Sequence, residues 1–238
     1  MTLPTDPLAR NLAAVRDRIA AAERRSGRPA GSVTLIGVVK TQPSDVIAAA
    51  VALGLMDLGE NKVQEAELHQ RTVPRDAARW HHIGHLQSNK AGKAVAMFDC
   101  LHGVDDADLA EAIARRARAA GKVQPVLLEV NISGEASKFG AAPDAVRALA
   151  MRVAAMPELR LQGLMTVGAP VGTPEEARPG FVRLRELRDL VARDLGRELP
   201  ELSMGMSGDY EVAVEEGATM VRVGTALFGA RSPQPGGA

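Results

Sequence analysis

The sequence has very little cysteine and few aromatic residues. Cys100 is the single cysteine, so no disulfide can form within the chain, and we expect a reducing compartment. Only 3% of the 238 residues are aromatic, with one tryptophan and one tyrosine. This scarcity predicts an aliphatic core and argues against the aromatic stacking platforms that bind single-stranded nucleic acid.

The chain also lacks an excess of charge of either sign and any long apolar run. Its 29 basic and 29 acidic residues are interleaved and give a formal net charge of zero, which is not the pattern of a nucleic-acid-binding protein. No run approaches the roughly 18 apolar residues that span a bilayer. The N-terminus has no apolar core of a signal peptide. We therefore expect a cytoplasmic protein with neither a membrane nor a nucleic-acid partner.

One apolar stretch, residues 33–41, ends abruptly on a lysine. Its β-branched residues predict a strand that is buried on both faces, as in parallel sheets covered by helices. Lys40 then lies at the C-terminal end of the strand, where α/β folds place their chemistry. A lysine in a partly apolar pocket loses its charge more readily, and the neutral amine can form a Schiff base with a carbonyl compound. The alternative is a lysine that only marks where the strand meets water.

A pattern of strand, polar loop and helix recurs along the whole sequence. An amphipathic helix over residues 6–25 precedes the first strand. Seven further strands are expected at residues 56–59, 80–84, 100–104, 125–132, 161–167, 202–206 and 219–223. Eight units without a change in composition favour an α/β fold that closes as a single (β/α)8 TIM barrel over residues 1–231, rather than an open doubly wound sheet. Residues 232–238, rich in proline and glycine, are expected to be disordered.

In such a barrel the residues that follow each strand share one face. Ser207-Gly208 and Gly224-Thr225 follow the seventh and eighth strands, where barrels often bind phosphate through backbone amides and hydroxyls. The alternative is that the two glycines only form turns. An amine on one side of the barrel mouth and a phosphate site on the other suit a phosphorylated aldehyde, for which pyridoxal 5′-phosphate (PLP) is the obvious candidate.

Several longer motifs resemble those of one known family. They are Lys40-Thr41, GENKVQE at 59–65, WHHIGHLQSNK at 80–90, SMGMS at 203–207 and VRVGTALFG at 221–229. In this order, from about residue 10 to Arg231, they resemble the YggS/PROSC family of pyridoxal phosphate homeostasis proteins. The resemblance implies a barrel like the N-terminal domain of alanine racemase, which is fold type III of the PLP-dependent proteins, with an extra N-terminal helix.

The resemblance also implies which residues bind the cofactor. Lys40 would hold PLP as a Schiff base, and Ser207, Gly224 and Thr225 would hold its phosphate. These roles follow from the matching motifs and not from spacing alone.

Two further site residues and two departures belong to the same resemblance. Arg222 would face the pyridine nitrogen, and Asn61 would line the ring pocket. Lys62 stands where the family usually has tyrosine, and His82 where it usually has phenylalanine. Both substitutions replace an aromatic side chain by a polar one and question any ring-packing role there.

Arg222 bears on the expected activity. A permanently charged guanidinium disfavours protonation of the pyridine nitrogen, and an unprotonated ring is a weaker electron sink. Alanine racemase supplies a second base, a tyrosine, from another domain. We expect no second domain in this chain, and its one tyrosine, Tyr210, is interpreted as an ordinary helix-start residue.

The predicted function is therefore binding of PLP in intracellular vitamin B6 homeostasis, with little or no turnover, and with transient contacts to PLP-dependent apoenzymes. The alternative is a PLP-dependent amino-acid racemase that uses the same lysine. A phosphosugar-processing barrel with a Schiff-base lysine fits the architecture but not the motifs.

Two other features have a functional and a plain interpretation. His81, His82 and His85 suggest a metal cluster, but no cysteine or carboxylate pattern completes it, and consecutive strand residues point to opposite faces, so no metal site is predicted. Lys138 follows the fifth strand and is either a second amine near the mouth for transient cofactor capture or a solvated loop lysine.

Overall fold

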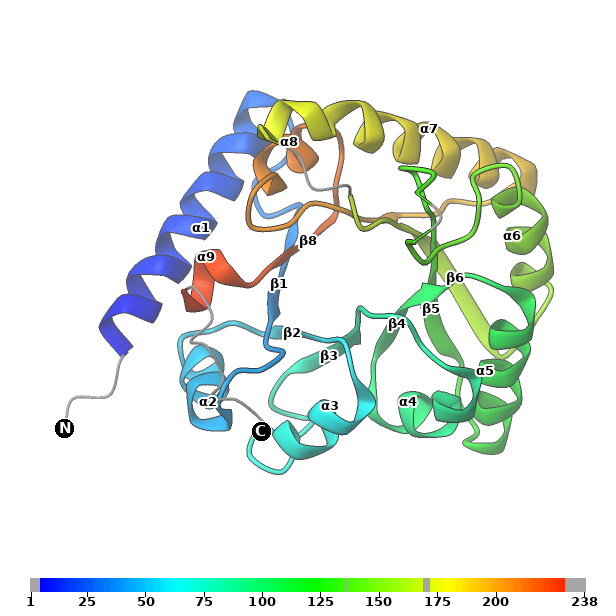
Figure 1. Ribbon diagram of the computed structural model, residues 1–238, viewed down its shortest axis with the longest axis horizontal. Coiled ribbons are helices and arrows are strands. Elements are labelled where there is room, and N and C mark those ends of the chain that lie inside the picture. The colour runs from blue at the N-terminus through cyan, green and yellow to red at the C-terminus, as the bar shows by residue number, and fades with distance from the viewer. Residues whose placement is uncertain (1–4, 136, 169–171, 230–238) are drawn as a thin grey trace.

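Eight parallel strands close into a barrel in sequence order, each paired with the next and β8 paired with β1 (Figure 1). The computed structural model describes residues 5–135, 137–168 and 172–229. The strands are β1 (Thr34–Val38), β2 (Asp57–Glu60), β3 (Arg79–His82), β4 (Cys100–Val104), β5 (Gln124–Glu129), β6 (Leu159–Met165), β7 (Glu201–Ser203) and β8 (Met220–Val223). The predicted (β/α)8 barrel is confirmed.

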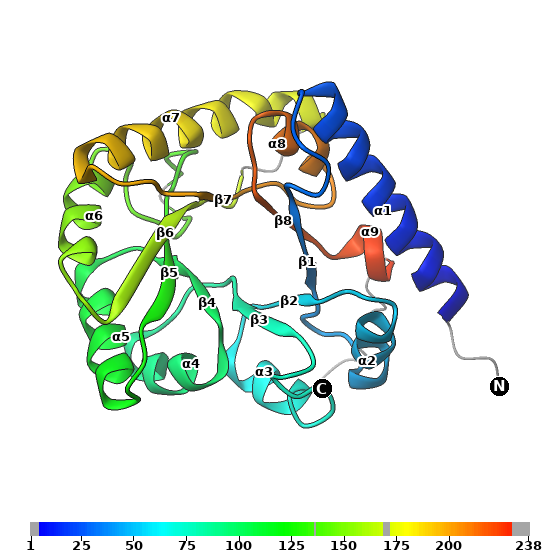
Figure 2. The same cartoon turned by 180° about the vertical axis from the view of Figure 1, so that it is seen from behind.

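Helices follow the strands and form the outer ring (Figure 2). They are α1 (Thr5–Arg25), α2 (Ser44–Ala52), α3 (Val63–His69), the 3-10 turn η1 (Ser88–Lys90), α4 (Ala91–Met97), α5 (Ala107–Ala119), α6 (Val146–Ala154), the 3-10 turn η2 (Pro174–Ala177), α7 (Arg178–Leu195), α8 (Tyr210–Glu215) and α9 (Thr225–Phe228). At the start of α5, the Asp106 carboxylate caps the helix by accepting a hydrogen bond from the Leu109 backbone amide at 2.7 Å. None of the helices in the described ranges has the length and apolar character that crossing a membrane requires.

The helix that precedes the first strand, α1, covers one side of the barrel. Leu8, Leu12, Val15, Ile19 and Ala22 recur at helical spacing and are all buried. Their stripe packs α1 against α8 and α9, and both views show α1 lying outside β1 and β8 (Figures 1 and 2). The extra N-terminal helix expected from the sequence is thereby confirmed.

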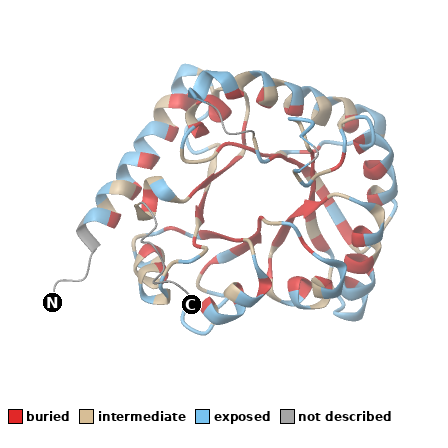
Figure 3. Cartoon of the chain, in the orientation of Figure 1, coloured by how far each residue is buried: buried red, intermediate tan, exposed pale blue. Residues whose placement is uncertain are grey.

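Alternation along the strands divides the buried residues into two sets. Outward-facing residues such as Trp80 join the main core under the helices, whereas inward-facing residues form a separate small cluster inside the barrel. That inner cluster consists of Ile36, Cys100, Leu127, Met165 and Met220. The strands are almost continuously buried for this reason (Figure 3).

The element boundaries differ from the sequence prediction mainly at the strand ends. β1 ends at Val38, so Lys40 lies two residues beyond it. β7 ends at Ser203 instead of 206, because Gly205 adopts a left-handed φ of 89° and turns the chain toward α8. The predicted tail, residues 232–238, lies outside the described residues.

Candidate functional site

A cavity of about 300 Å³ opens at the C-terminal end of the barrel. Its wall includes Lys40, Asn61, Ser207, Arg222, Gly224 and Thr225. The structure therefore brings together all six residues that the sequence predicted for one site, although their role toward PLP stays a prediction. The volume lies at the lower end of the range for small-molecule sites.

Lys40 is presented to this cavity by a tight turn. The Gln42 amide donates to the Val39 carbonyl at 3.0 Å, which makes Lys40 and Thr41 the two central residues of the turn. Thr41 has a φ of 64°, a left-handed conformation that β-branched residues rarely adopt. Such strain costs about 1–3 kcal/mol and persists where the surrounding fold imposes it. The turn thus holds Lys40 at the mouth at some cost to stability.

Asn61 is held on the next strand end by its neighbours. The buried Glu60 carboxylate accepts hydrogen bonds from the backbone amide of Asn61 at 3.2 Å and from Nδ1 of the His69 ring at 2.8 Å. Across the loop, a Cβ on Gly84 would lie 2.6 Å from the Asn61 carbonyl oxygen, so only glycine permits this approach of the two strand ends. Together these contacts set the position of Asn61 in the cavity wall.

The loops after β7 and β8, the latter strand being the neighbour of β1, gather backbone amides around one oxygen atom. The Ser207 Oγ accepts hydrogen bonds from the amides of Gly224 at 3.1 Å and Ala226 at 3.3 Å. The Asp209 carboxylate holds the preceding loop by accepting from the Met206 amide at 2.6 Å. Convergent amides of this kind also bind anionic oxygens, and a phosphate oxygen would here replace the Ser207 Oγ as their acceptor. This geometry fits the predicted phosphate contact of Ser207, Gly224 and Thr225.

Arg222 reaches the cavity from inside the barrel. Its guanidinium donates to the Ser203 Oγ and to the Thr166 carbonyl, each at 2.8 Å, and the residue is buried. Burial lowers the pKa of Arg222 to about 10, partly offset by Glu129 and Asp209. The side chain therefore remains charged at neutral pH, beside the same cavity as Lys40.

Sequence reasoning missed a set of buried polar residues below Arg222. His102 contacts Ser203, and its ring also contacts His81, which in turn contacts Asp57. The available signal was a histidine in the middle of the otherwise apolar strand Cys100–Val104.

The histidines that meet are not the three that the sequence grouped. Possible ligand atoms of His81, Cys100 and His102 lie within 4.8 Å of one another inside the barrel. His85 instead stacks on Phe139 with ring centroids 3.9 Å apart. The ring nitrogens of His81 and His102 already hydrogen-bond each other at 3.0 Å, and the expectation of no metal site stays a prediction.

Two carboxylates at the ends of β4 and β5 were also missed. Glu129 and Asp105 are largely buried, and one oxygen of each has no hydrogen-bond partner within the described residues. Burial raises the pKa of Glu129 to about 7; Asp105 adds to this rise and Arg222 opposes it. Glu129 is thus poised to change charge near neutral pH at the mouth of the barrel.

The raised pKa of Glu129 predicts a pH-dependent cost to stability. The unfolded chain loses this proton near pH 4.5, but the folded chain retains it up to about pH 7, so the free energy of unfolding should fall as pH rises through that window. Glu129→Gln has no carboxyl group to titrate at this position, so its free energy of unfolding does not fall for this reason. Relative to the wild type, we expect the variant to gain about 2–3 kcal/mol between about pH 5 and pH 8 in urea unfolding of the ligand-free protein. Glu198→Gln, at an exposed position, controls for the loss of a glutamate as such. A difference between Glu129→Gln and the wild type that does not vary with pH would contradict the prediction.

The chain is similar in sequence to proteins of one family. Residues 10–232 match the family model described as alanine racemase, N-terminal domain. The chain is 44% identical over 224 residues to the "Pyridoxal phosphate homeostasis protein" of Pseudomonas aeruginosa, covering 94% of this chain and 96% of that protein. It is 42% identical over 220 residues to the protein of the same name from Aquifex aeolicus, covering 92% and 96%.

The chain belongs to the pyridoxal phosphate homeostasis protein family. Among solved structures, PipY of Synechococcus elongatus PCC7942 with PLP bound is 38% identical, with a TM-score of 0.80 over 93% of this chain and all of that one. The resemblance inferred from the motifs is confirmed.

The two residues that depart from the family pattern, His82 and Lys62, lie in different environments. His82 is buried, and its ring packs edge-on against Phe98 with centroids 5.1 Å apart, so ring packing persists at this position. Burial lowers the pKa of His82 to about 4, so the ring is neutral at physiological pH. Lys62, in contrast, has a side chain 70% exposed and pairs with Glu65 at 3.0 Å.

The remaining candidate side chains of this family member are engaged in local contacts. Lys138 pairs with the Glu135 carboxylate at 2.9 Å and donates to the Gly168 carbonyl at 3.3 Å, with only 20% of its side chain exposed. It is therefore not a solvated loop lysine, and its role toward PLP stays open. Tyr210 begins α8, as predicted, and is buried in the main core.

Proposed function

We propose that this chain binds PLP through Lys40 and serves in homeostasis of that cofactor, with little or no turnover. PLP is held as a Schiff base, in which the lysine nitrogen bonds to the aldehyde carbon and water leaves. Binding in this form keeps a reactive aldehyde out of solution, and release supplies it to PLP-dependent apoenzymes. The names of the relatives and the PLP-bound PipY structure support this proposal.

One observation carries the proposal. The Lys40 amine, the amides that converge at Ser207 and the Arg222 guanidinium all border the same cavity. A ligand with an aldehyde, a phosphate and a ring nitrogen has one group for each. Few other metabolites combine these three groups, which is why a phosphorylated sugar explains the site less well.

The absence of turnover is proposed from the charge of Arg222. A guanidinium that stays charged leaves the ring nitrogen of PLP unprotonated, which weakens the cofactor as an electron sink. A racemase would also need a second base on the far side of the substrate. Tyr210, the single tyrosine, is buried in the core and does not supply one.

Racemisation by the loaded protein is the test of this point. Purified protein saturated with PLP should convert L-alanine to D-alanine at rates far below about 1 per second, the lower end for ordinary enzymes. Chiral chromatography of the amino acid measures the conversion, with free PLP as the control. Turnover of about 1 per second or faster would favour the racemase and exclude the carrier role.

A further inference from the structure

A continuous chain of hydrogen bonds crosses the interior of the barrel below the Lys40 cavity. Arg222 on β8 contacts the Ser203 Oγ on β7 at 2.8 Å, and that oxygen lies 3.0 Å from Nδ1 of His102 on β4. Nε2 of His102 lies 3.0 Å from Nδ1 of His81 on β3, and Nε2 of His81 lies 2.9 Å from the Asp57 carboxylate on β2. All five residues are buried.

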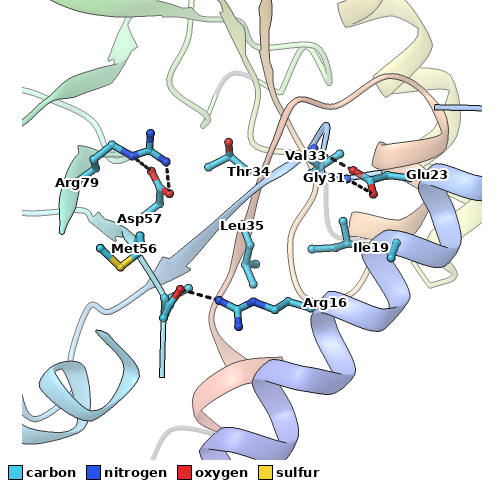
Figure 4. A pocket seen from close by; sticks show the side chains of 13 residues that line it. Arg16, Ile19, Glu23, Gly31, Val33, Thr34, Leu35, Met56, Asp57 and Arg79 are labelled. Carbon is cyan, nitrogen blue, oxygen red and sulfur yellow. Dashed lines mark hydrogen bonds and ion pairs between the residues drawn. The ribbon is translucent and has the colours of Figure 1, made fainter. Parts of the chain in front are cut away.

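The far end of this chain lies at the opposite mouth of the barrel. Asp57 is the first residue of β2 and accepts two hydrogen bonds from Arg79, at 2.8 and 2.6 Å. Both residues line a cavity at the N-terminal ends of the first three strands (Figure 4). The chain therefore runs from the floor of the predicted cofactor site to the other end of the fold.

With both imidazole rings neutral, the two ends of this hydrogen-bond chain allow only one arrangement of protons between them. A guanidinium can only donate hydrogen bonds, and a carboxylate can only accept them. His81 must therefore donate from Nε2 to Asp57, which leaves its Nδ1 as an acceptor for the Nε2–H of His102. The Nδ1 of His102 then accepts from the Ser203 hydroxyl, whose oxygen accepts from Arg222.

The opposite arrangement leaves a buried group without a partner. If His102 carried its proton on Nδ1, both His102 and Arg222 would donate to the Ser203 Oγ. The hydroxyl proton of Ser203 would then have no acceptor on the chain, at the cost of an unsatisfied buried donor. Full burial is the main reason why the pKa of His102 lies well below its usual value. His81, Arg222 and His82 lower this pKa further, so the ring stays neutral.

We propose that His102 is a positioning residue whose neutral, Nε2-protonated ring orients Ser203, so that Arg222 presents its guanidinium to the Lys40 cavity in one direction. The Thr166 carbonyl holds the other branch of the guanidinium at 2.8 Å. With both branches held, the face toward the cavity is fixed before a ligand arrives. The consequence for PLP rests on the proposed function: the oriented guanidinium recognises the ring nitrogen.

The first test concerns the protons themselves and needs no cofactor. In ligand-free protein labelled with ¹⁵N-histidine, long-range ¹H–¹⁵N spectra should show His102 neutral across about pH 6 to pH 8, with its proton on Nε2 and with Nδ1 unprotonated. His81→Gln and His102→Asn assign the signals. A proton on Nδ1 of His102 would overturn the proposal, and would be expected if His81, Cys100 and His102 instead held a metal ion through the Nε2 of His102.

The second test reads the contact of Arg222 with the ring nitrogen. We compare the affinity for PLP with that for 1-deazapyridoxal 5′-phosphate, which has carbon in place of the ring nitrogen. The wild type should prefer PLP by about tenfold, as for one hydrogen bond to a charged group. The preference should fall to about onefold in Ser203→Ala and His102→Leu.

Two variants serve as matched controls for this ratio. His102→Asn keeps an acceptor near the position of Nδ1 and should retain the preference. Cys100→Ala changes a buried residue that is not part of the hydrogen-bond chain, and this variant should also retain the preference for PLP. If all variants weaken both ligands equally, His102 is only structural and the proposal is wrong. If neither ligand binds the wild type, the proposed function fails, while the histidine spectra still decide the proton arrangement.

Discussion

Lys40→Ala should abolish the visible absorption band of the PLP-loaded protein and its labelling by borohydride. Lys40 borders the cavity from a turn that positions it two residues beyond β1. Alanine leaves the phosphate contacts and Arg222 in place but removes the only group proposed to bond to the aldehyde carbon. We expect the dissociation constant for PLP to rise by at least about 100-fold, since non-covalent contacts alone remain.

Lys62→Ala is the matched control for this experiment. Lys62 also follows a barrel strand, but its side chain is exposed and paired with Glu65. Mass spectrometry after borohydride reduction should place one pyridoxyl group on Lys40 in both the wild type and Lys62→Ala, and none in Lys40→Ala. Equal labelling of all three proteins would show that another amine holds the cofactor, and Lys138 would be the first to examine.

Pyridoxal, which lacks the phosphate, should bind at least about 100-fold more weakly than PLP. The amides of Gly224 and Ala226 converge on the Ser207 oxygen, and Thr225 borders the same cavity. A hydrogen bond to a charged group contributes about 1.5–3 kcal/mol, so the loss of two such bonds predicts this factor. Titration of both ligands, followed by the visible spectrum, measures the difference.

Variants at the phosphate side show whether the difference arises there. Ser207→Ala should weaken PLP by about tenfold, as for one charge-assisted hydrogen bond, and leave pyridoxal nearly unchanged. Ser88→Ala removes an exposed hydroxyl from η1 and should change neither ligand. Equal weakening of PLP and pyridoxal by Ser207→Ala would mean that Ser207 supports the loop rather than the phosphate.

Local sequence was sufficient for the strands and helices because each has a clear period. Three patterns predicted elements that the structure shows: the apolar run before Lys40, the spacing of Leu8 to Ala22 and the repeat of eight units. Since parallel strands in a barrel share one C-terminal face, the residues that follow them could be grouped without coordinates. Lys40, Ser207 and Gly224 do lie around one cavity for this reason.

Strain and protonation could not be predicted in the same way. The left-handed φ of Thr41 follows from how the surrounding fold holds the turn, since threonine itself disfavours that conformation. The pKa of Glu129 is raised because its carboxyl group is buried and lies near Asp105. The sequence alone shows neither the burial nor the proximity of these two side chains. A glutamate at the end of a strand looks the same whether it is solvated or buried.

The amino-acid sequence by itself determined the number of strands and the face of the barrel that holds the cavity, and its family motifs indicated six of the residues in the cavity wall. Only the tertiary structure decided which polar side chains meet inside the barrel. Ser203 and His102 are 101 positions apart, and His102 and His81 are 21 apart. Periodicity specifies which side chains point inward, but the stagger of the strands on closure decides which of them touch. The hydrogen-bond chain from Asp57 to Arg222 is therefore a property of the closed barrel.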